Sequence, residues 1–182
     1  MNTSVKYILL SATTVLILIL TLLWTTTRST DYYFNEDVMP ATVKPLIQIL
    51  ENASYGEVIN IHVTTYGGDM FAGLDLIKAI RESHATVNIH VTKLAASAGA
   101  YLLCAADNVT IDKGAIVLFH TFHTIGPMGM PGPNMTDKDA KDAFDVAAMA
   151  LLKQDIFSNC KKILTQDEIN RVLNGEDVVI NH

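Results

Sequence analysis

The chain has 182 residues, of which 49% are hydrophobic, and a formal net charge of −6. Lys6 and Arg28 are the only charged side chains before Ser29, so the following 154 residues hold 11 basic and 19 acidic side chains, a net charge of −8. That length suits one domain with a single core. The acidic balance and the lack of a basic run argue against a nucleic-acid-binding protein, and the frequent Leu, Ile, Val and Phe exclude a disordered chain.

The first 28 residues contain a long apolar segment, Tyr7–Trp24, with 18 residues and no charge. As a helix it would span about 27 Å, close to the hydrocarbon thickness of a bilayer, with aromatic residues at both ends. A cleaved signal peptide is the alternative, since Thr25–Thr27 are small, but the run is longer than usual and no A-x-A-like site follows it. The sequence predicts an uncleaved single-pass membrane anchor over residues 1–28, whose orientation the flanking charges do not reveal.

Two cysteines, Cys104 and Cys160, stand 56 residues apart with neither CxxC nor Cys/His spacing. This pattern excludes a disulfide-rich scaffold and a zinc module, so both are predicted to be buried thiols and no metal or cofactor is expected.

Residues 29–38 are predicted to be a polar linker and residues 39–182 a single folded domain. Hydrophobic periodicity and turn residues separate the helices of that domain from its strands. The predicted elements are, in order, a helix over 40–52, a strand over Glu57–Thr64, the turn Tyr66–Asp69, a helix capped by Asp69, a strand over Ala85–Thr92, the turn Leu94–Ala98, a short apolar helix over Ser97–Ala106, and strands over Val109–Ile111 and Ala115–His120.

The last third of the chain begins with Thr121–Thr136, which is too rich in Gly, Pro and Met for a regular element. Asp137–Leu164 predicts a long helix and Gln166–Leu173 a short one, followed by the turn Asn174–Gly175. Because strand, turn and helix repeat, we expect an α/β fold of βα units with a mainly parallel sheet. Its functional groups should gather at the carboxyl ends of the strands.

Four features near those strand ends have ordinary structural explanations when taken singly. Gly67–Gly68 is typical of a tight turn, Ser97 of a helix N-cap, His120 of a half-buried imidazole and Asp177 of a solvated turn acid.

Taken together, they suggest nucleophilic catalysis. A serine at a strand-to-helix turn exposes its hydroxyl, and the N–H groups of Ala98 and Gly68 would form an oxyanion hole. His120 would accept the serine proton, and Asp177 would hold the imidazole in the required tautomer.

Other side chains compete for the role of the base. His123 is the second choice among the histidines, whereas His62 and His90 lie inside strands and are predicted to be structural. Lys138 or Lys141 would serve instead if desolvated, giving a Ser–Lys dyad.

Three segments, Ile59–Ile80, Val87–Leu103 and Ala115–His120, resemble the proteolytic subunit of Clp protease and, more broadly, the ClpP/crotonase superfamily. The resemblance spans about residues 39–177 and rests on the Gly-Gly turn, the small-residue serine elbow, the strand ending in histidine, and their order. It implies Ser97 as the nucleophile and His120 as the base.

The same resemblance implies an oxyanion hole at Gly68 and Ala98. It also implies Asp177 as the third catalytic member, although Glu176 is one residue away and the match needs a one-residue shift. The helix over Asp137–Leu164 corresponds to the family's handle helix, which joins stacked rings. A homo-oligomeric ring, a peptide or protein substrate and a separate ATPase unfoldase are therefore the expected partners, besides a lipid bilayer.

The chain also departs from the family pattern. It stops at His182, where the family continues with a helix and a strand, so we expect Asp177 to be loosely held or completed by a partner subunit. Membrane-bound relatives use Ser–Lys dyads on the same fold. The leading hypothesis is a membrane-anchored serine endopeptidase. The alternatives are a Ser–Lys membrane protease, a crotonase-type acyl-CoA enzyme and an inactive ClpP-like scaffold.

Overall fold

The structure is a computed structural model that describes residues 14–15, 28–120 and 156–181. Within these ranges no helix has the length and apolar character needed to cross a bilayer. The predicted anchor, Tyr7–Trp24, lies outside the described residues except for Thr14 and Val15.

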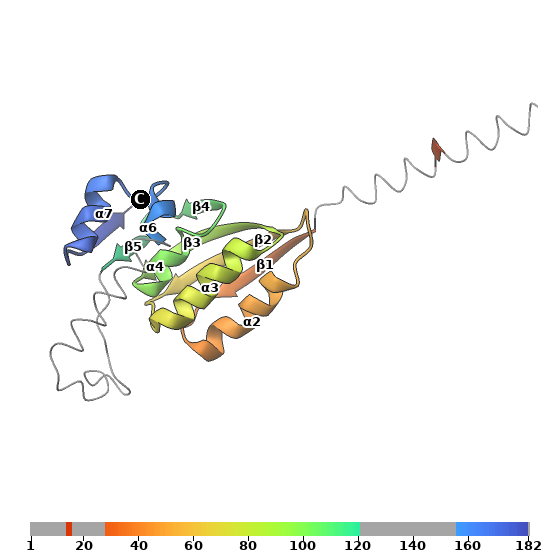
Figure 1. Cartoon of the computed structure of the whole chain (residues 1–182), viewed down its shortest axis with the longest axis horizontal. Coiled ribbons are helices and arrows are strands. Elements are labelled where there is room, and N and C mark those ends of the chain that lie inside the picture. The colour runs from red at the N-terminus through yellow and green to blue at the C-terminus, as the bar shows by residue number, and fades with distance from the viewer. Residues whose placement is uncertain (1–13, 16–27, 121–155, 182) are drawn as a thin grey trace, which may run out of the picture.

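The described residues form one mixed α/β unit built on a single sheet (Figure 1). Its elements are β1 (Ser29–Phe34), α2 (Pro40–Glu51), β2 (Val58–Thr65), α3 (Met70–Glu82), β3 (Thr86–Ala96), α4 (Ala98–Leu102), β4 (Asn108–Ile111), β5 (Ile116–Phe119), α6 (Phe157–Cys160), α7 (Gln166–Leu173) and β6 (Val178–Asn181). The strand order is β1-β2-β3-β5-β6, with β4 also paired to β3. All these pairings are parallel except β5 with β6, which confirms the predicted mainly parallel sheet.

The βα units form in the predicted order, but β3 extends to Ala96, so the predicted turn over Leu94–Ala98 begins as strand. Strand β2 alternates buried and partly exposed residues, as expected of a strand with one face on the core. Helix α3 begins where the Asp69 carboxylate accepts the Ala72 N–H at 2.7 Å, so the predicted cap is confirmed. Helix α7 begins with a capping box between Thr165 and Glu168.

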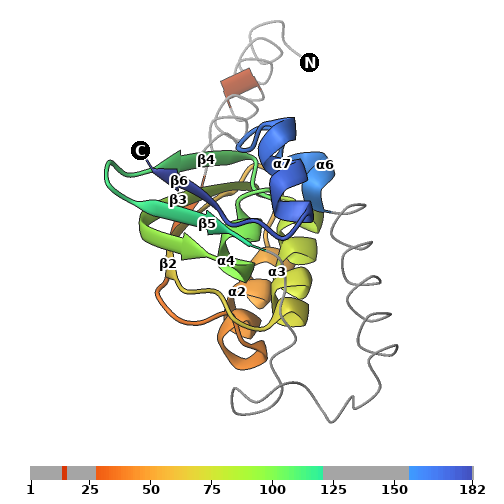
Figure 2. The same ribbon diagram turned by 90° about the vertical axis from the view of Figure 1, so that its left-hand side faces the viewer.

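Helices α2, α3, α6 and α7 gather along one side of the sheet (Figure 2). The core lies between them and the strands, and its largest fully buried side chains include Leu46, Ile61, Leu76, Ile89 and Tyr101. Burial of these side chains, at about 25 cal/mol per Å² of apolar surface, is what holds the two layers together.

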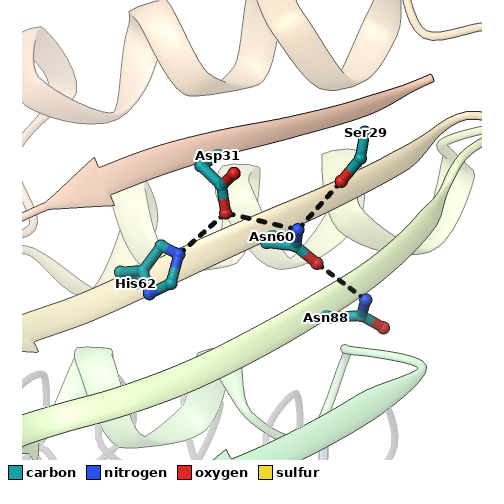
Figure 3. Close-up of polar contacts among 5 residues, drawn as sticks. All are labelled: Ser29, Asp31, Asn60, His62 and Asn88. Atoms are coloured by element: carbon teal, nitrogen blue, oxygen red, sulfur yellow. Dashed lines mark hydrogen bonds and ion pairs between the residues drawn. The ribbon is translucent and has the colours of Figure 1, made fainter.

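The opposite face of the sheet carries a ladder of polar side chains on neighbouring strands (Figure 3). The amide of Asn88 donates to Asn60 at 2.8 Å, and the amide of Asn60 contacts Asp31 at 3.3 Å. The imidazole of His62 also bonds to Asp31, at 2.9 Å. His90 on β3 is paired with His62 in the register of β2 and β3. These lateral bonds link the side chains of β1, β2 and β3 where the described helices do not cover them.

The predicted linker over residues 29–38 was wrong in part, because it contains β1. This strand pairs with β2 from Ser29↔Val58 to Phe34↔Val63. Only Phe34 is fully buried, so β1 is an edge strand whose mostly polar sequence resembles a linker.

Residues 156–181, here called the C-terminal unit, comprise α6, α7 and β6. The predicted long helix over Asp137–Leu164 lies mostly outside the described residues, and its described end is helical only over Phe157–Cys160. Strand β6 was not predicted, since four residues carry little periodicity.

The prediction of two free buried thiols was wrong, because Cys104 and Cys160 form a disulfide with a Cα–Cα distance of 4.5 Å. Sequence spacing gives no information on this contact, because the sheet and α4 bring together two residues that are 56 positions apart. The bond joins the end of α4 to the C-terminal unit.

We expect the polar ladder to make stability depend on pH through Asp31. Hydrogen bonds from His62 and then Asn60 hold the pKa of Asp31 below its ordinary value of 3.8. A carboxyl group with a lowered folded pKa stabilises the fold above its unfolded pKa, and this contribution is lost as the pH falls through the folded pKa. Asp31→Asn should therefore flatten the decline of the unfolding free energy below about pH 4, measured by urea denaturation. Equal declines in both proteins would contradict this account.

Candidate active site

Ser97 occupies a strained turn between β3 and α4. Its backbone angles are φ 55° and ψ −128°, and among the described residues it is the one non-glycine residue with a positive φ. The Ser97 N–H donates to the carbonyl of Leu118 on β5 at 2.9 Å, and its side chain makes no capping bond to α4. This is the geometry of a nucleophile elbow, in which a tight strand-to-helix turn presents the hydroxyl at the top of the sheet.

The glycine turn after β2 lies directly against this elbow. A Cβ atom added to Gly67 would lie 2.5 Å from the Ala96 carbonyl oxygen, 2.6 Å from the Ser97 Cβ and 3.1 Å from the Ala98 nitrogen. A Cβ atom on Gly68 would collide with the carbonyl oxygen of Val38. Both glycines also have a positive φ, 93° and 147°, so glycine is required by conformation and by space.

The backbone donors of this turn are used selectively. Val38 N–H donates to the Gly67 carbonyl at 2.8 Å, Asp69 N–H donates to the Val38 carbonyl at 2.7 Å, and Gly67 N–H donates to the Thr65 hydroxyl at 3.1 Å. Among the described residues, no acceptor is recorded for the N–H of Gly68 or Ala98. These are the two donors that the sequence predicts for an oxyanion hole.

The sheet brings His120 and Asp177 to the same place. His120 directly follows β5, and the antiparallel register Phe119↔Val178 makes His120 and Asp177 the next positions of the two paired strands. The return of the chain as β6 therefore supplies the juxtaposition that the sequence alone left open.

Glu176, the competing carboxylate, has another partner. Its side chain accepts a hydrogen bond from Arg171 Nε at 2.9 Å, which raises the pKa of Arg171. This ion pair favours Asp177 over Glu176 as the acid beside His120.

The remaining candidates fall into two groups. His62 and His90 bond to Asp31 and Asp112 at 2.9 and 2.7 Å on the polar face. His123, Lys138 and Lys141 lie outside the described residues.

Tyr101 is a residue at this site that the sequence analysis did not single out. Its phenol donates to the backbone carbonyl of His120 at 2.8 Å, and its buried ring packs edge-on against Phe119 with centroids 5.4 Å apart. Burial raises the pKa of Tyr101, so the phenol stays a neutral donor. Its position four residues after Ser97, in a run of small residues, was the available signal. The elbow helix α4 is thus bonded to the residue proposed as the base.

A comparison with family models shows a match to the family described as Clp protease over residues 32–126, just over half of the chain. The chain belongs to the Clp protease family. The matched range starts within β1 and includes Gly68, Ser97, Ala98 and His120, whereas Asp177 lies beyond it. No curated protein matches the chain. Family membership supports a ClpP-like peptidase domain on this α/β fold.

Gly67→Ala should disrupt the elbow. The added methyl group collides with the Ala96 carbonyl and the Ser97 side chain, so the serine must move, and misplacement by about 1 Å costs on the order of 100-fold in rate. We expect the rate of labelling by a serine-reactive fluorophosphonate to fall by about that factor.

Gly56→Ala is the matched control for this substitution. Gly56 also has a positive φ, 83°, but an added Cβ has no neighbour within 4 Å. The Gly56→Ala substitution should lower the free energy of unfolding by about 1 kcal/mol through backbone strain, and it should leave the labelling rate of the folded protein unchanged. Equal losses of labelling in the two variants would show that strain alone, and not contact with the elbow, explains the requirement for glycine.

Tyr101→Phe should loosen His120 while the core is retained. The variant keeps the ring that packs on Phe119 but leaves the His120 carbonyl without the phenol donor. A net loss of about 1 kcal/mol in stability and about a tenfold slower labelling are expected. Unchanged labelling with lower thermal stability would limit Tyr101 to a structural role.

Proposed function

We propose that the chain is a ClpP-like serine endopeptidase that hydrolyses peptide bonds through an acyl-enzyme on Ser97. The observation that carries this proposal is the backbone of Ser97, whose positive φ and strand-to-helix position are typical of an exposed nucleophile. The adjacent glycine turn and membership of the Clp protease family support the same reaction class.

In the proposed reaction, the Ser97 hydroxyl oxygen attacks the carbonyl carbon of the scissile peptide bond, and its proton passes to the imidazole of His120. Asp177 orients the imidazole and stabilises its charged form. The N–H groups of Gly68 and Ala98 stabilise the negative oxygen of the tetrahedral intermediate.

Collapse of that intermediate breaks the C–N bond, and the leaving amine takes the proton from His120. Water then attacks the ester on Ser97, again with His120 as the base, and releases the acid product. Apart from the water and the substrate, every group used in these reaction steps is a residue of the chain, so the proposed reaction requires no cofactor.

The proposal extends to attachment and assembly. The apolar segment Tyr7–Trp24 supports a single-pass membrane anchor, because its length matches a bilayer. Family membership supports a homo-oligomeric ring that acts on protein substrates, with a separate ATPase as a candidate partner.

Fluorophosphonate labelling of the full chain in membrane and soluble fractions tests these points together. Wild type should be labelled and Ser97→Ala should not. Asp177→Asn should slow labelling by at least about 100-fold, since an asparagine holds the imidazole in the wrong tautomer. Recovery of the labelled protein with washed membranes, at a native mass of several subunits, is the expected outcome for attachment and assembly.

Matched variants separate the competing mechanisms. Glu176→Gln should label within about twofold of wild type, because Glu176 is paired with Arg171. Loss of labelling in Lys138→Ala or Lys141→Ala, but not in His120→Ala, would replace the triad with a Ser–Lys dyad. A correctly assembled wild type that takes no label would favour the scaffold alternative.

A further inference from the structure

The disulfide between Cys104 and Cys160 joins the two parts of the chain that carry the proposed catalytic residues. Cys104 lies just beyond α4, the helix that follows Ser97, and Cys160 ends α6 in the C-terminal unit that also contains Asp177. Both cysteines are almost fully buried, with exposed fractions of 1% and 0%. The bond is therefore an internal link between the elbow helix and the segment that presents the carboxylate.

Apolar side chains of the C-terminal unit also pack into the core beside this link, among them Ile156, Phe157 and Leu164. The ring of Phe157 packs edge-on against Tyr101 with centroids 5.8 Å apart. The ammonium group of Lys162 donates to the carbonyl of Ala106, and burial lowers the pKa of Lys162. Lys162 itself is an exposed residue, so this bond contributes little to holding the unit in place.

The main-chain connection of the C-terminal unit to the sheet is also short. Among the described residues it consists of the four-residue pairing between β5 and β6. The β1–β2–β3 part of the sheet, in contrast, has longer registers and is covered by α2 and α3. Loss of the disulfide should thus make local opening of the C-terminal unit easier while β2 and β3 stay protected.

We propose that the Cys104–Cys160 disulfide is a maturation bond, which completes the active site only where the chain meets an oxidising compartment. Two thiols lose two protons and two electrons to form the bond, and a disulfide-bearing thiol oxidoreductase of that compartment accepts them and becomes a dithiol. Such bonds form and persist outside the reducing cytosol. The catalytic domain is accordingly assigned to the extracytoplasmic side, and its activity depends on the bond; this second part rests on the proposed peptidase function.

The first experiment counts thiols in the full chain recovered from its native host. The sequence has two cysteines, so alkylation in denaturant without reductant gives an unambiguous mass shift. We expect no alkylated thiol before reduction and two after it. Two free thiols in the native protein would overturn the proposal.

The second experiment asks what reduction does, and it does not depend on catalysis. Hydrogen exchange of the full chain should show faster exchange of residues 156–181 after reduction, while the amides of β2 and β3 stay protected. A Cys104→Ala/Cys160→Ala variant should show the fast pattern in both redox states. Unchanged protection of residues 156–181 on reduction would overturn the proposed link.

The third experiment connects the bond to the site. Fluorophosphonate labelling of Ser97 should slow at least about tenfold on reduction and recover on reoxidation, since Asp177 leaves His120 when the unit detaches. The Cys104→Ala/Cys160→Ala variant should label at the slow rate with or without reductant. Equal rates in oxidised and reduced wild type would overturn the dependence of activity on the bond.

These outcomes separate the two proposals. If the oxidised wild type takes no label at all, the peptidase function fails, while thiol counting and hydrogen exchange still decide whether the disulfide forms and holds the C-terminal unit. If labelling is fast in both redox states, the peptidase function stands and the maturation role fails.

Discussion

The positive φ of Ser97 is the constraint on which the arrangement of the site depends. A non-glycine residue in this region costs about 1–3 kcal/mol and persists only where its surroundings fix it. Here the Ser97 N–H is bonded to the carbonyl of Leu118, and Gly67 packs so closely on Ser97 that an added Cβ would lie 2.6 Å from the Ser97 Cβ. A Cβ atom on Gly99 would also collide with the side chain of Thr65. The small residues around Ser97 are therefore a packing requirement of the elbow.

The strand order distributes the proposed functional residues around that elbow. Strand β3 lies between β2 and β5, so the glycine turn that ends β2 and the histidine that follows β5 reach the elbow from opposite sides. Strand β6 runs antiparallel to β5, and its beginning rather than its end lies at this edge of the sheet. The residue before β6, Asp177, thus arrives next to His120, although the rest of the sheet is parallel.

Elements of the fold that depend on local chemistry could be predicted from the sequence, whereas contacts that depend on long-range pairing could not. The alternating, β-branched pattern of β2 and the cap at Asp69 are determined by neighbouring residues in the sequence, and both were predicted. Strand β1 was missed because its polar edge-strand sequence has almost no buried face. The Cys104–Cys160 bond and the β5–β6 register were missed because each depends on where distant segments meet. Tyr101 was missed because its position in the small-residue run marks it as unusual but does not show that its phenol bonds to the backbone carbonyl of His120.

The two halves of the proposed site also differ in what holds them. Ser97, Ala98 and the glycine turn are fixed by the buried core of β2, β3 and α3, so the proposed nucleophile and the proposed oxyanion donors are as stable as the fold itself. The segment that carries Asp177 is held by a four-residue edge strand, one covalent link and the buried apolar side chains of the C-terminal unit. In a triad, the oxyanion hole and substrate binding alone retain about 10³–10⁴-fold catalysis over water when a triad member is removed. Under the proposed mechanism, displacement of the C-terminal unit would therefore leave a residual reaction, and the full rate would require that unit to be docked.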